Sequence, residues 1–371
     1  MIDIDRQTAF SGTKDVALTL AFDTGRLADY LAARLLGFVG PLSVRQFKGG
    51  QSNPTYLIET PARRYVLRRK PPGKLLPSAH AVDREFRVLG ALDAHRFPVA
   101  RPLLYCDDPN VIGTVFYVME HVEGRVFWDP HMPDATRDER AAIYDCMNAT
   151  QAQLHAFDPS ALGLADFGRG ESYMARQVDR WSKQYRASET ETIDEMERLM
   201  GWLPAHLPPA GQVRLVHGDF RLDNVIVSPS GSTILAVLDW ELATLGDPLA
   251  DFTYHLMAWD MPPSPTSVGF GSLAGRDLDA LGIPSRSAYV AAYRKHTGFD
   301  PEPHLNVYLA YNFFRLAAIL QGIAGRVRDG TAASENAAGL ARMVHPLATR
   351  AWMFACDAGA RAEAASAKGA Q

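Results

Sequence analysis

The apolar residues of the first 120 positions follow two different periods. Leu27, Leu31 and Leu35 are spaced as on one face of a helix, and a stripe that begins with Val82 and Phe86 predicts a second helix. Runs of β-branched and aromatic residues, bounded by Gly, Pro and Asn, predict strands at residues 44–47, 56–59, 65–68 and 114–120. We therefore expect an antiparallel sheet with two helices in this part of the chain.

Helical periodicity dominates after Gly124. It predicts helices at residues 137–157, 173–186, 287–296, 305–327 and 332–355. One hairpin interrupts them, with strands at 224–227 and 233–238 around a Ser-Pro-Ser-Gly turn. The Ala-rich segment 358–371 is expected to be disordered.

The two patterns together predict an α+β, bilobal protein. Its small β-rich N-terminal lobe would comprise residues 1–120, and residues 121–124 would form a hinge. Residues 125–357 would form a larger, mainly helical C-terminal lobe. Because clefts between lobes commonly bind ligands, the functional site is expected near the hinge.

Composition and charge exclude several classes of protein. Of the 371 residues, 47% are hydrophobic and 22% charged, which is ordinary for a soluble globular protein. The net charge of −4 gives no general attraction to nucleic acid or to an anionic membrane, so neither is expected as a partner.

Sparse cysteines and an N-terminus without the features of a secretory signal predict a cytoplasmic protein. Residues 307–327 are apolar but contain Asn312, Arg315 and Gln321, so we expect a packed helix rather than a membrane span. The oligomeric state stays open.

The segment HGDFRLDN at residues 217–224, followed by LDWE at 238–241, carries the most informative chemistry. Asp219 and Asn224 are five residues apart, the separation between the catalytic Asp and the metal-binding Asn of kinase catalytic loops. The hairpin returns the chain towards Asn224, although simple pairing places Asp239 three or four residues too far along. Mg²⁺ prefers oxygen ligands such as Asn224 and Asp239 offer, and Asp219 could take the proton of an acceptor hydroxyl. In the alternative, Asp219 caps a turn and Asn224 supports the hairpin.

These segments resemble the signature of the aminoglycoside phosphotransferase and choline kinase-like superfamily. The motifs that carry the resemblance are HGDFRLDN, LDWELATLGDPLADF, GGQSNPTYLI, YVLRRKPPG and SAHAVDREFRVLGAL. The similarity runs from about residue 25 to about residue 355 and is closest to the kinase-like domain that some proteins fuse to acyl-CoA dehydrogenases. It implies a bilobal protein-kinase-like fold and Mg²⁺-dependent transfer of the γ-phosphate of ATP, or of GTP, to a small-molecule acceptor.

The resemblance also implies roles for single residues. Asp219 would be the catalytic base, and Asn224 and Asp239 would be the Mg²⁺ ligands. His217 would be a structural member of the catalytic loop, and Asp251 would accept backbone hydrogen bonds from that loop.

The N-terminal lobe is expected to supply the nucleotide contacts. A loop that could place backbone N–H groups over phosphate oxygens comprises Gly49, Gly50, Gln51, Ser52 and Asn53. Arg68 stands at the position of the phosphate-binding Lys of kinases, with Lys70 as a competitor, and Glu85 is its expected partner. Backbone groups of Glu120 and Val122 in the hinge region would meet the adenine.

The acceptor is the least defined part of the site. Basic residues outnumber acidic ones after Pro301, which does not favour a polycationic aminoglycoside. Candidate acceptor residues are Glu241, Tyr173, Arg176, Arg180 and Arg315. The row from Arg176 to Arg180 could meet the phosphates of coenzyme A or could be a solvated face. The face with Arg315 could hold an anionic or amphipathic acceptor or form salt bridges between the lobes. The resemblance to domains fused to acyl-CoA dehydrogenases favours a hydroxyacyl-CoA acceptor.

Three other functions are weighed against this one. A protein kinase is disfavoured because no APE-like segment and no evident activation loop follow Asp239. A nucleotide-binding scaffold without catalysis, and an aminoglycoside or choline-type kinase, remain as alternatives.

Overall fold

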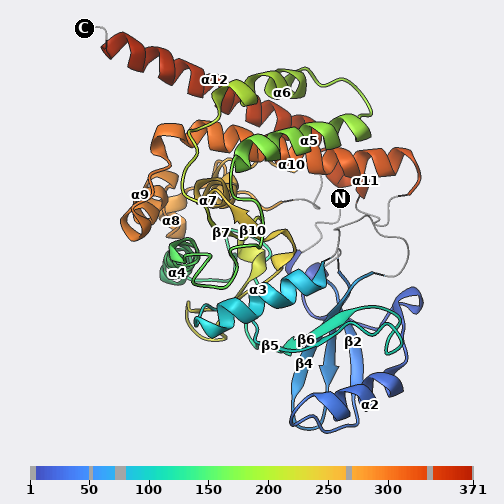
Figure 1. Cartoon of the computed structure of the whole chain (residues 1–371). Helices are drawn as coiled ribbons and strands as arrows, with labels where there is room; N and C mark the ends of the chain where they lie inside the picture. The colour runs from blue at the N-terminus through green and yellow to red at the C-terminus, as the bar shows by residue number, and fades with distance from the viewer. Residues whose placement is uncertain (1–5, 50–52, 72–80, 265–269, 332–336, 370–371) are drawn as a thin grey trace.

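The N-terminal lobe is built on an antiparallel sheet. The structure is a computed structural model that describes residues 6–49, 53–71, 81–264, 270–331 and 337–369. Within these ranges the sheet has six strands in the order β1-β2-β3-β4-β6-β5. The strands are β1 (Thr13–Lys14), β2 (Ser43–Phe47), β3 (Thr55–Glu59), β4 (Arg64–Arg69), β5 (Pro102–Cys106) and β6 (Phe116–Glu120). Figure 1 shows this lobe below the larger helical lobe.

Helices cover both faces of the sheet. The helices of this lobe are α1 (Arg6–Phe10), α2 (Thr24–Arg34) and α3 (Val82–Ala94). Leu27 and Leu31 of α2 share one buried cluster with Leu67, whereas Leu89 of α3 shares the other with Val66. Because successive strand residues point to opposite faces, α2 and α3 must pack on opposite sides of β4. The helix α3 thereby lies on the side that meets the C-terminal lobe.

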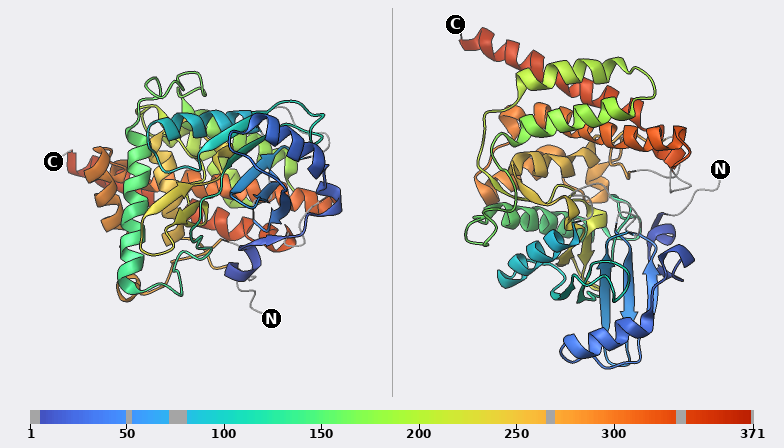
Figure 2. Two further views of the ribbon diagram at one scale, coloured as in Figure 1. Left: turned by 90° about the horizontal axis from the view of Figure 1, so that it is seen from below. Right: turned by 45° about the vertical axis from the view of Figure 1, so that its right-hand side comes forward.

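The C-terminal lobe is mainly helical. Its helices are α4 (Arg137–Ala156), α5 (Tyr173–Ser188), α6 (Asp194–His206), α7 (Pro248–Leu256), α8 (Leu278–Leu281), α9 (Arg286–Thr297), α10 (Leu305–Arg328), α11 (Ala337–Ala341) and α12 (Val344–Gly369). Two small sheets pair β7 (Arg214–Val216) with β10 (Thr244–Gly246) and β8 (Val225–Val227) with β9 (Ile234–Val237). In both views of Figure 2 and in Figure 1, α10 runs through this lobe among the other helices.

Burial explains the composition of α10. Among the described residues, one helical segment, Glu302–Arg328, is long and apolar enough to cross a membrane, but 78% of its most apolar window is buried in the protein. The predicted packed helix is therefore present. The polar residues Asn312, Arg315 and Gln321 are themselves buried. Val327 is 36% exposed because it lies in the last turn of the helix.

Several elements differ from the sequence predictions. We did not predict the strands β1, β5 and β10 or the helices α6 and α7, since short strands and Pro-containing helices have weak patterns. The helix predicted at 332–355 is divided: residues 332–336 lie outside the described ranges, and α11 and α12 are separated at residues 342–343. Pro346 is tolerated in a first helical turn, which explains why a new helix begins at Val344.

The structure also corrects the prediction for the C-terminal segment. The helix α12 continues to Gly369, through the segment for which we expected disorder. Its Ala, Glu, Arg and Lys residues have high helix propensity. Figure 1 shows the end of α12 extending beyond α6, away from the rest of the lobe.

Candidate active site between the lobes

The β8–β9 hairpin brings Asp239 next to the catalytic loop. The N–H of Leu238 donates to the carbonyl oxygen of Asn224 at 2.8 Å, so Asp239 lies one residue beyond the partner of Asn224. The expected displacement of three or four residues is wrong because the turn is wider than assumed and the register shifts between Ile226 and Val227. Asp239 has φ 63° and ψ 62°, a left-handed conformation that is costly for a non-glycine residue and is typical of functional sites.

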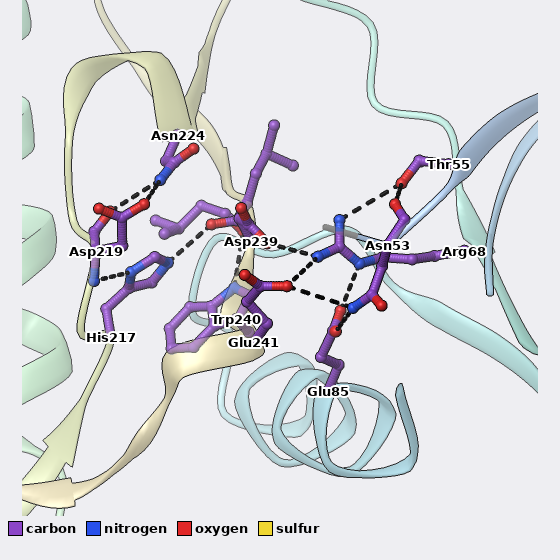
Figure 3. A network of polar contacts seen from close by, with 12 residues as sticks. Asn53, Thr55, Arg68, Glu85, His217, Asp219, Asn224, Asp239, Trp240 and Glu241 are labelled. Atoms are coloured by element: carbon purple, nitrogen blue, oxygen red, sulfur yellow. Dashed lines mark hydrogen bonds and ion pairs between the residues drawn. The ribbon is translucent and has the colours of Figure 1, made fainter. Parts of the chain in front are cut away.

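The side chain of Asn224 positions Asp219. Its Nδ2 donates to the carbonyl oxygen of Asp219 at 2.9 Å and to the carboxylate Oδ2 at 3.0 Å (Figure 3). The 3₁₀ helix Leu222–Asn224 folds the loop back and makes this contact possible. Because the amide nitrogen is used by Asp219, the amide oxygen is the atom of Asn224 that can ligate a metal ion.

The oxygen atoms at this point fit a magnesium ion that is shared with a phosphate group. In the described part of the chain, no group of three or more His, Cys, Asp or Glu side chains could hold a metal ion. Asp239 and Asn224 offer two oxygen ligands, and Mg²⁺ commonly binds through one or two such groups together with phosphate oxygens and water. These two residues could therefore hold a metal ion that takes its other ligands from outside the protein.

A buried hydrogen-bond chain supports the catalytic loop. Nδ1 of His217 accepts from the N–H of Asp219 at 3.1 Å, and Nε2 donates to the carbonyl oxygen of Leu238 at 2.8 Å. Asp251 accepts from the backbone N–H groups of His217 at 3.0 Å and Gly218 at 2.7 Å. The prediction that Asp251 accepts backbone hydrogen bonds from the loop is confirmed.

Asp251 has a further partner that the sequence did not reveal. His155 of α4 lies 3.0 Å from its Oδ2 through Nε2, and the other ring nitrogen of His155 lies 2.7 Å from the hydroxyl of Tyr293. Burial by itself would raise the pKa of Asp251, but the hydrogen bonds from His155 and the loop hold it below its usual value. Asp251 is therefore a charged anchor inside the C-terminal lobe.

Arg68 connects the N-terminal lobe to the candidate metal ligand. Its Nε is 2.7 Å from Oε2 of Glu85, and its Nη2 is 2.5 Å from Oδ1 of Asp239 (Figure 3). Burial would lower the pKa of Arg68, but the carboxylates of Asp239 and Glu85 outweigh burial and raise it. The predicted pair of Arg68 and Glu85 is confirmed.

Two residues predicted to touch ligands belong instead to this network. Asn53 is fully buried, and its Nδ2 donates to Oε1 of Glu85 at 2.7 Å and to Oε2 of Glu241 at 3.4 Å. Glu241 also lies 3.5 Å from Nη2 of Arg68. The amide of Asn53 therefore anchors the glycine loop to α3, and Glu241 faces the N-terminal lobe rather than an acceptor.

A large cavity lies between the lobes beside these groups. Its volume is about 530 Å³, within the range of cofactor sites. Arg68, Glu120, Val122, Asn224 and Asp239 line it, whereas Lys70 does not. Glu120 and Val122, which we expected at the adenine, are thus among the residues that line the cavity. Apolar side chains complete one wall of the cavity: Val66, Leu89, Ala100 and Met119.

The glycine loop can be placed only in part. Gly49 lines the cavity, while Gly50, Gln51 and Ser52 lie outside the described residues. A Cβ atom at Gly49 would approach Cη2 of Trp128 to 3.0 Å, so the absence of a side chain allows this loop to meet the C-terminal lobe.

Arg315 has a different place from the one expected. It is buried, and its Nη2 donates to the carbonyl oxygen of Gly218 at 2.7 Å. Its cation lies 4.9 Å from the ring centre of Tyr254. Arg315 therefore supports the catalytic loop from inside the lobe, because α10 is buried on this face too and carries no interlobe surface here.

The predicted row on α5 is also removed from the cavity. Tyr173 is buried, and its ring fills the space where Gly246 lacks a side chain. Arg176 donates to the carbonyl oxygen of Arg169, and the exposed Arg180 lies 5.0 Å from the ring centre of Trp181. These contacts agree with a solvated face.

Two side chains next to Asp219 were missed. Arg221 places Nε 3.2 Å from Oδ1 of Asp219 and Nη2 3.3 Å from Oδ2 of Asp223. Burial and the charge of Asp219 raise the pKa of the Tyr254 hydroxyl. Arg221 could have been found from the sequence, because it lies only two residues after the candidate base. Tyr254 comes from α7, and nothing in the sequence pointed to it.

The fold and this site define a small-molecule phosphotransferase with a kinase-like fold. The sequence model of the phosphotransferase enzyme family matches residues 43–281, and the chain belongs to this family. A solved Ralstonia eutropha structure, provisionally named an aminoglycoside phosphotransferase, is 46% identical, with a TM-score of 0.82 over 91% of this chain and 99% of that chain.

More distant structures share the fold. A choline kinase from Cryptosporidium parvum has a TM-score of 0.60 at 12% identity, over 91% of this chain and 96% of its own. A spectinomycin phosphotransferase solved with ADP and spectinomycin has a TM-score of 0.59 at 12% identity, over 90% of this chain and 98% of its own.

Longer proteins contain a similar region. Mouse acyl-CoA dehydrogenase family member 10 is 46% identical over 94% of this chain, which corresponds to 33% of the mouse protein. The chicken family member 11 is 45% identical over 91% of this chain and 44% of its own length. The chain thus spans less than half the length of these relatives, and the predicted resemblance to a kinase-like fusion domain is confirmed.

Proposed function

We propose that the protein transfers the γ-phosphate of ATP, or of GTP, to a hydroxyl group of a small molecule in a Mg²⁺-dependent reaction. The observation that carries the proposal is that Asn224 and Asp239 line the cavity between the lobes, while Asn224 holds the carboxylate of Asp219 through a 3.0 Å hydrogen bond. The family match supports the same reaction class, and the ADP bound to the spectinomycin phosphotransferase supports a nucleotide in the cavity.

Each residue would contribute by position and charge. Asp239 and Asn224 would hold Mg²⁺, which would neutralise charge on the phosphates. Asp219, oriented by Asn224, would align the acceptor hydroxyl and accept its proton. Arg68, already held by Glu85, would place a positive charge at the phosphates.

The acceptor is proposed from the relatives of this chain. The names of the longer relatives include an acyl-CoA dehydrogenase, which favours a hydroxyacyl-CoA or another anionic or amphipathic acceptor. An aminoglycoside or choline-type acceptor is the rival. A catalytically inactive scaffold is another, and it would also bind nucleotide.

Removal of the metal should abolish turnover. Nucleotide consumption with a library of hydroxyacyl-CoA esters, sugars, amino alcohols and aminoglycosides should require Mg²⁺ and stop with EDTA. Asp239→Asn should lower turnover about a hundredfold or more, because a charged metal ligand is lost. Asp179→Asn, which changes an exposed carboxylate paired with Lys183, is the matched control and should retain activity. Mg²⁺-dependent nucleotide binding without consumption of any acceptor would favour the scaffold.

Arg68→Lys should weaken nucleotide binding about tenfold. Lysine keeps the charge but cannot reach Glu85 and Asp239 together, and a hydrogen bond to a charged group is worth about 1.5–3 kcal/mol. The control is Arg69→Lys, which alters a neighbouring buried Arg bonded to the carbonyl oxygen of Leu20. Calorimetric titration with ADP measures both variants. Equal losses in the two would mean that Arg68 has only a structural role.

A further inference from the structure

A second recess adjoins the nucleotide cavity on the side of the C-terminal lobe. Its volume is about 50 Å³, enough for a small polar group but not for a sugar ring, since one water needs roughly 10–15 Å³ on this measure. Trp128 and Asp223 line both spaces. We call it the Asp223 recess and define it by Arg6, Trp128, Arg221, Asp223, His255 and Phe270.

Buried nitrogen atoms without hydrogen-bond partners gather in this recess. Within the described ranges, they are Nε of Arg6, Nε1 of Trp128 and Nε2 of His255. Arg221 faces the carboxylate of Asp219 without hydrogen-bond geometry. His255 is only 3% exposed. Buried polar atoms are normally paired, so such a cluster indicates a ligand or ordered water.

The chemistry of these atoms selects the ligand group. The nitrogen atoms of Arg6, Trp128 and Arg221 can only donate hydrogen bonds. Burial lowers the pKa of His255 to about 3, so its ring is neutral and adds no positive charge. The nearby carboxylates of Asp219 and Asp223 are already paired with Arg221, which leaves little attraction for an ammonium group. The recess therefore suits an oxygen atom that accepts hydrogen bonds.

The rest of the lining is apolar. Met257, Met261 and Phe270 form part of the wall, and the cation of Arg221 lies 5.5 Å from the ring centre of Phe270. A hydrocarbon stem could lie along these side chains. Since Arg221 also contacts Asp219, a molecule held here would be next to the candidate base.

The N-terminal helix α1 supplies one wall. Nε2 of Gln7 donates to the carbonyl oxygen of Val126 at 2.8 Å, and Oε1 of Gln7 accepts from the N–H of Trp128 at 3.2 Å. The rings of Phe10 and Trp128 are 5.1 Å apart. These contacts join α1 to the segment after the hinge and set Arg6 at the recess.

We infer that the Asp223 recess is the acceptor subsite and that it binds a carboxylate or carbonyl group on a short hydrocarbon stem. To call the bound molecule an acceptor rests on the proposed function. The binding site itself can be tested without turnover.

The test measures how hexanoate and hexylammonium bind to the full chain in the presence of ADP and Mg²⁺. Binding is monitored by titration with saturation-transfer NMR. Hexanoate should bind, and hexylammonium should bind at least about tenfold more weakly. Arg6→Gln and Trp128→Phe should each weaken hexanoate binding about tenfold, because each removes a donor. Trp128→Phe keeps an aromatic ring against Phe10. Arg26→Gln, which changes an exposed Arg paired with Asp23, should have no effect.

Unchanged melting temperatures of the variants show that they are folded; ADP affinity is not used for this, because Trp128 also lines the nucleotide cavity. The inference is overturned if hexanoate does not bind, if hexylammonium binds equally well, or if both variants bind hexanoate like the wild type. Loss of the proposed function has a separate signature, the absence of Mg²⁺-dependent nucleotide consumption with every acceptor.

Discussion

Asp219→Asn is expected to lower phosphoryl transfer by about 10²–10⁴-fold, the usual contribution of a positioned general base. The substitution removes the proton-accepting charge with little change of shape. The amide oxygen of the new residue can still accept from Nδ2 of Asn224, which donates to Asp219 at 3.0 Å in the wild type. The loop should therefore keep its conformation, and ADP should bind with unchanged affinity.

The measurement is the rate of nucleotide consumption with an acceptor from the library, together with calorimetric titration of ADP. The exposed Asp179→Asn again serves as the control. Wild-type turnover by Asp219→Asn would contradict the assignment of the base. A loss of both turnover and ADP binding would point to a misfolded loop instead, and the melting temperature would reveal it.

Asp251→Asn should give the largest loss of stability, about 3 kcal/mol. The carboxylate accepts backbone N–H groups of His217 and Gly218 and faces His155, and an amide cannot accept all three contacts. Each buried donor that loses its partner costs about 1–3 kcal/mol. Urea unfolding followed by fluorescence measures the free energy of unfolding. Turnover should fall as well, because the same hydrogen bonds hold the catalytic loop.

The pH dependence of this loss has a definite sign. The pKa of Asp251 lies below its usual value, so its carboxylate stabilises the fold above the unfolded pKa of about 3.9. That contribution is lost as the pH falls through the lower, folded pKa. The difference between wild type and Asp251→Asn should thus be constant above about pH 5 and shrink in stronger acid.

Asp247→Asn provides a control of opposite sign. Burial raises the pKa of Asp247 despite its hydrogen bonds from Tyr308 and Leu249. The stability that wild type has relative to this variant should therefore decrease as the pH rises from the unfolded to the folded pKa of Asp247. The same trend in both variants would contradict the assignment of Asp251 as a charged anchor.

The spacing of residues along the chain predicted structure correctly where the interacting residues lie in one loop, strand or helix. Asp219 and Asn224 belong to one short loop, so their contact follows from a separation of five residues. The hydrophobic periodicity predicted the strand with Arg68 and the helix with Glu85. Both elements belong to the N-terminal lobe. The periods of strands and helices differ, so the hydrophobic pattern of these segments predicted the type of each element. It did not show that Arg68 and Glu85 are themselves buried.

Other features depended on contacts between distant segments. A wide turn and a register shift decided the position of Asp239, and neither changes the hydrophobic pattern. Asn53 reads as a loop residue, yet packing of α3 against the sheet buries it beside Glu85. Arg315 reads as part of a polar face, yet the helix around it is enclosed.

The sequence by itself therefore determined the lobes, the catalytic loop and the class of chemistry, since these depend on residues near each other in the chain. Only the tertiary structure decided the support for Asp251 by His155, 96 residues away, and the meeting of Arg6 with Trp128 beside Asp223. Such contacts arise from how complete elements pack, and the free energy of that packing is spread over many side chains rather than encoded in one motif.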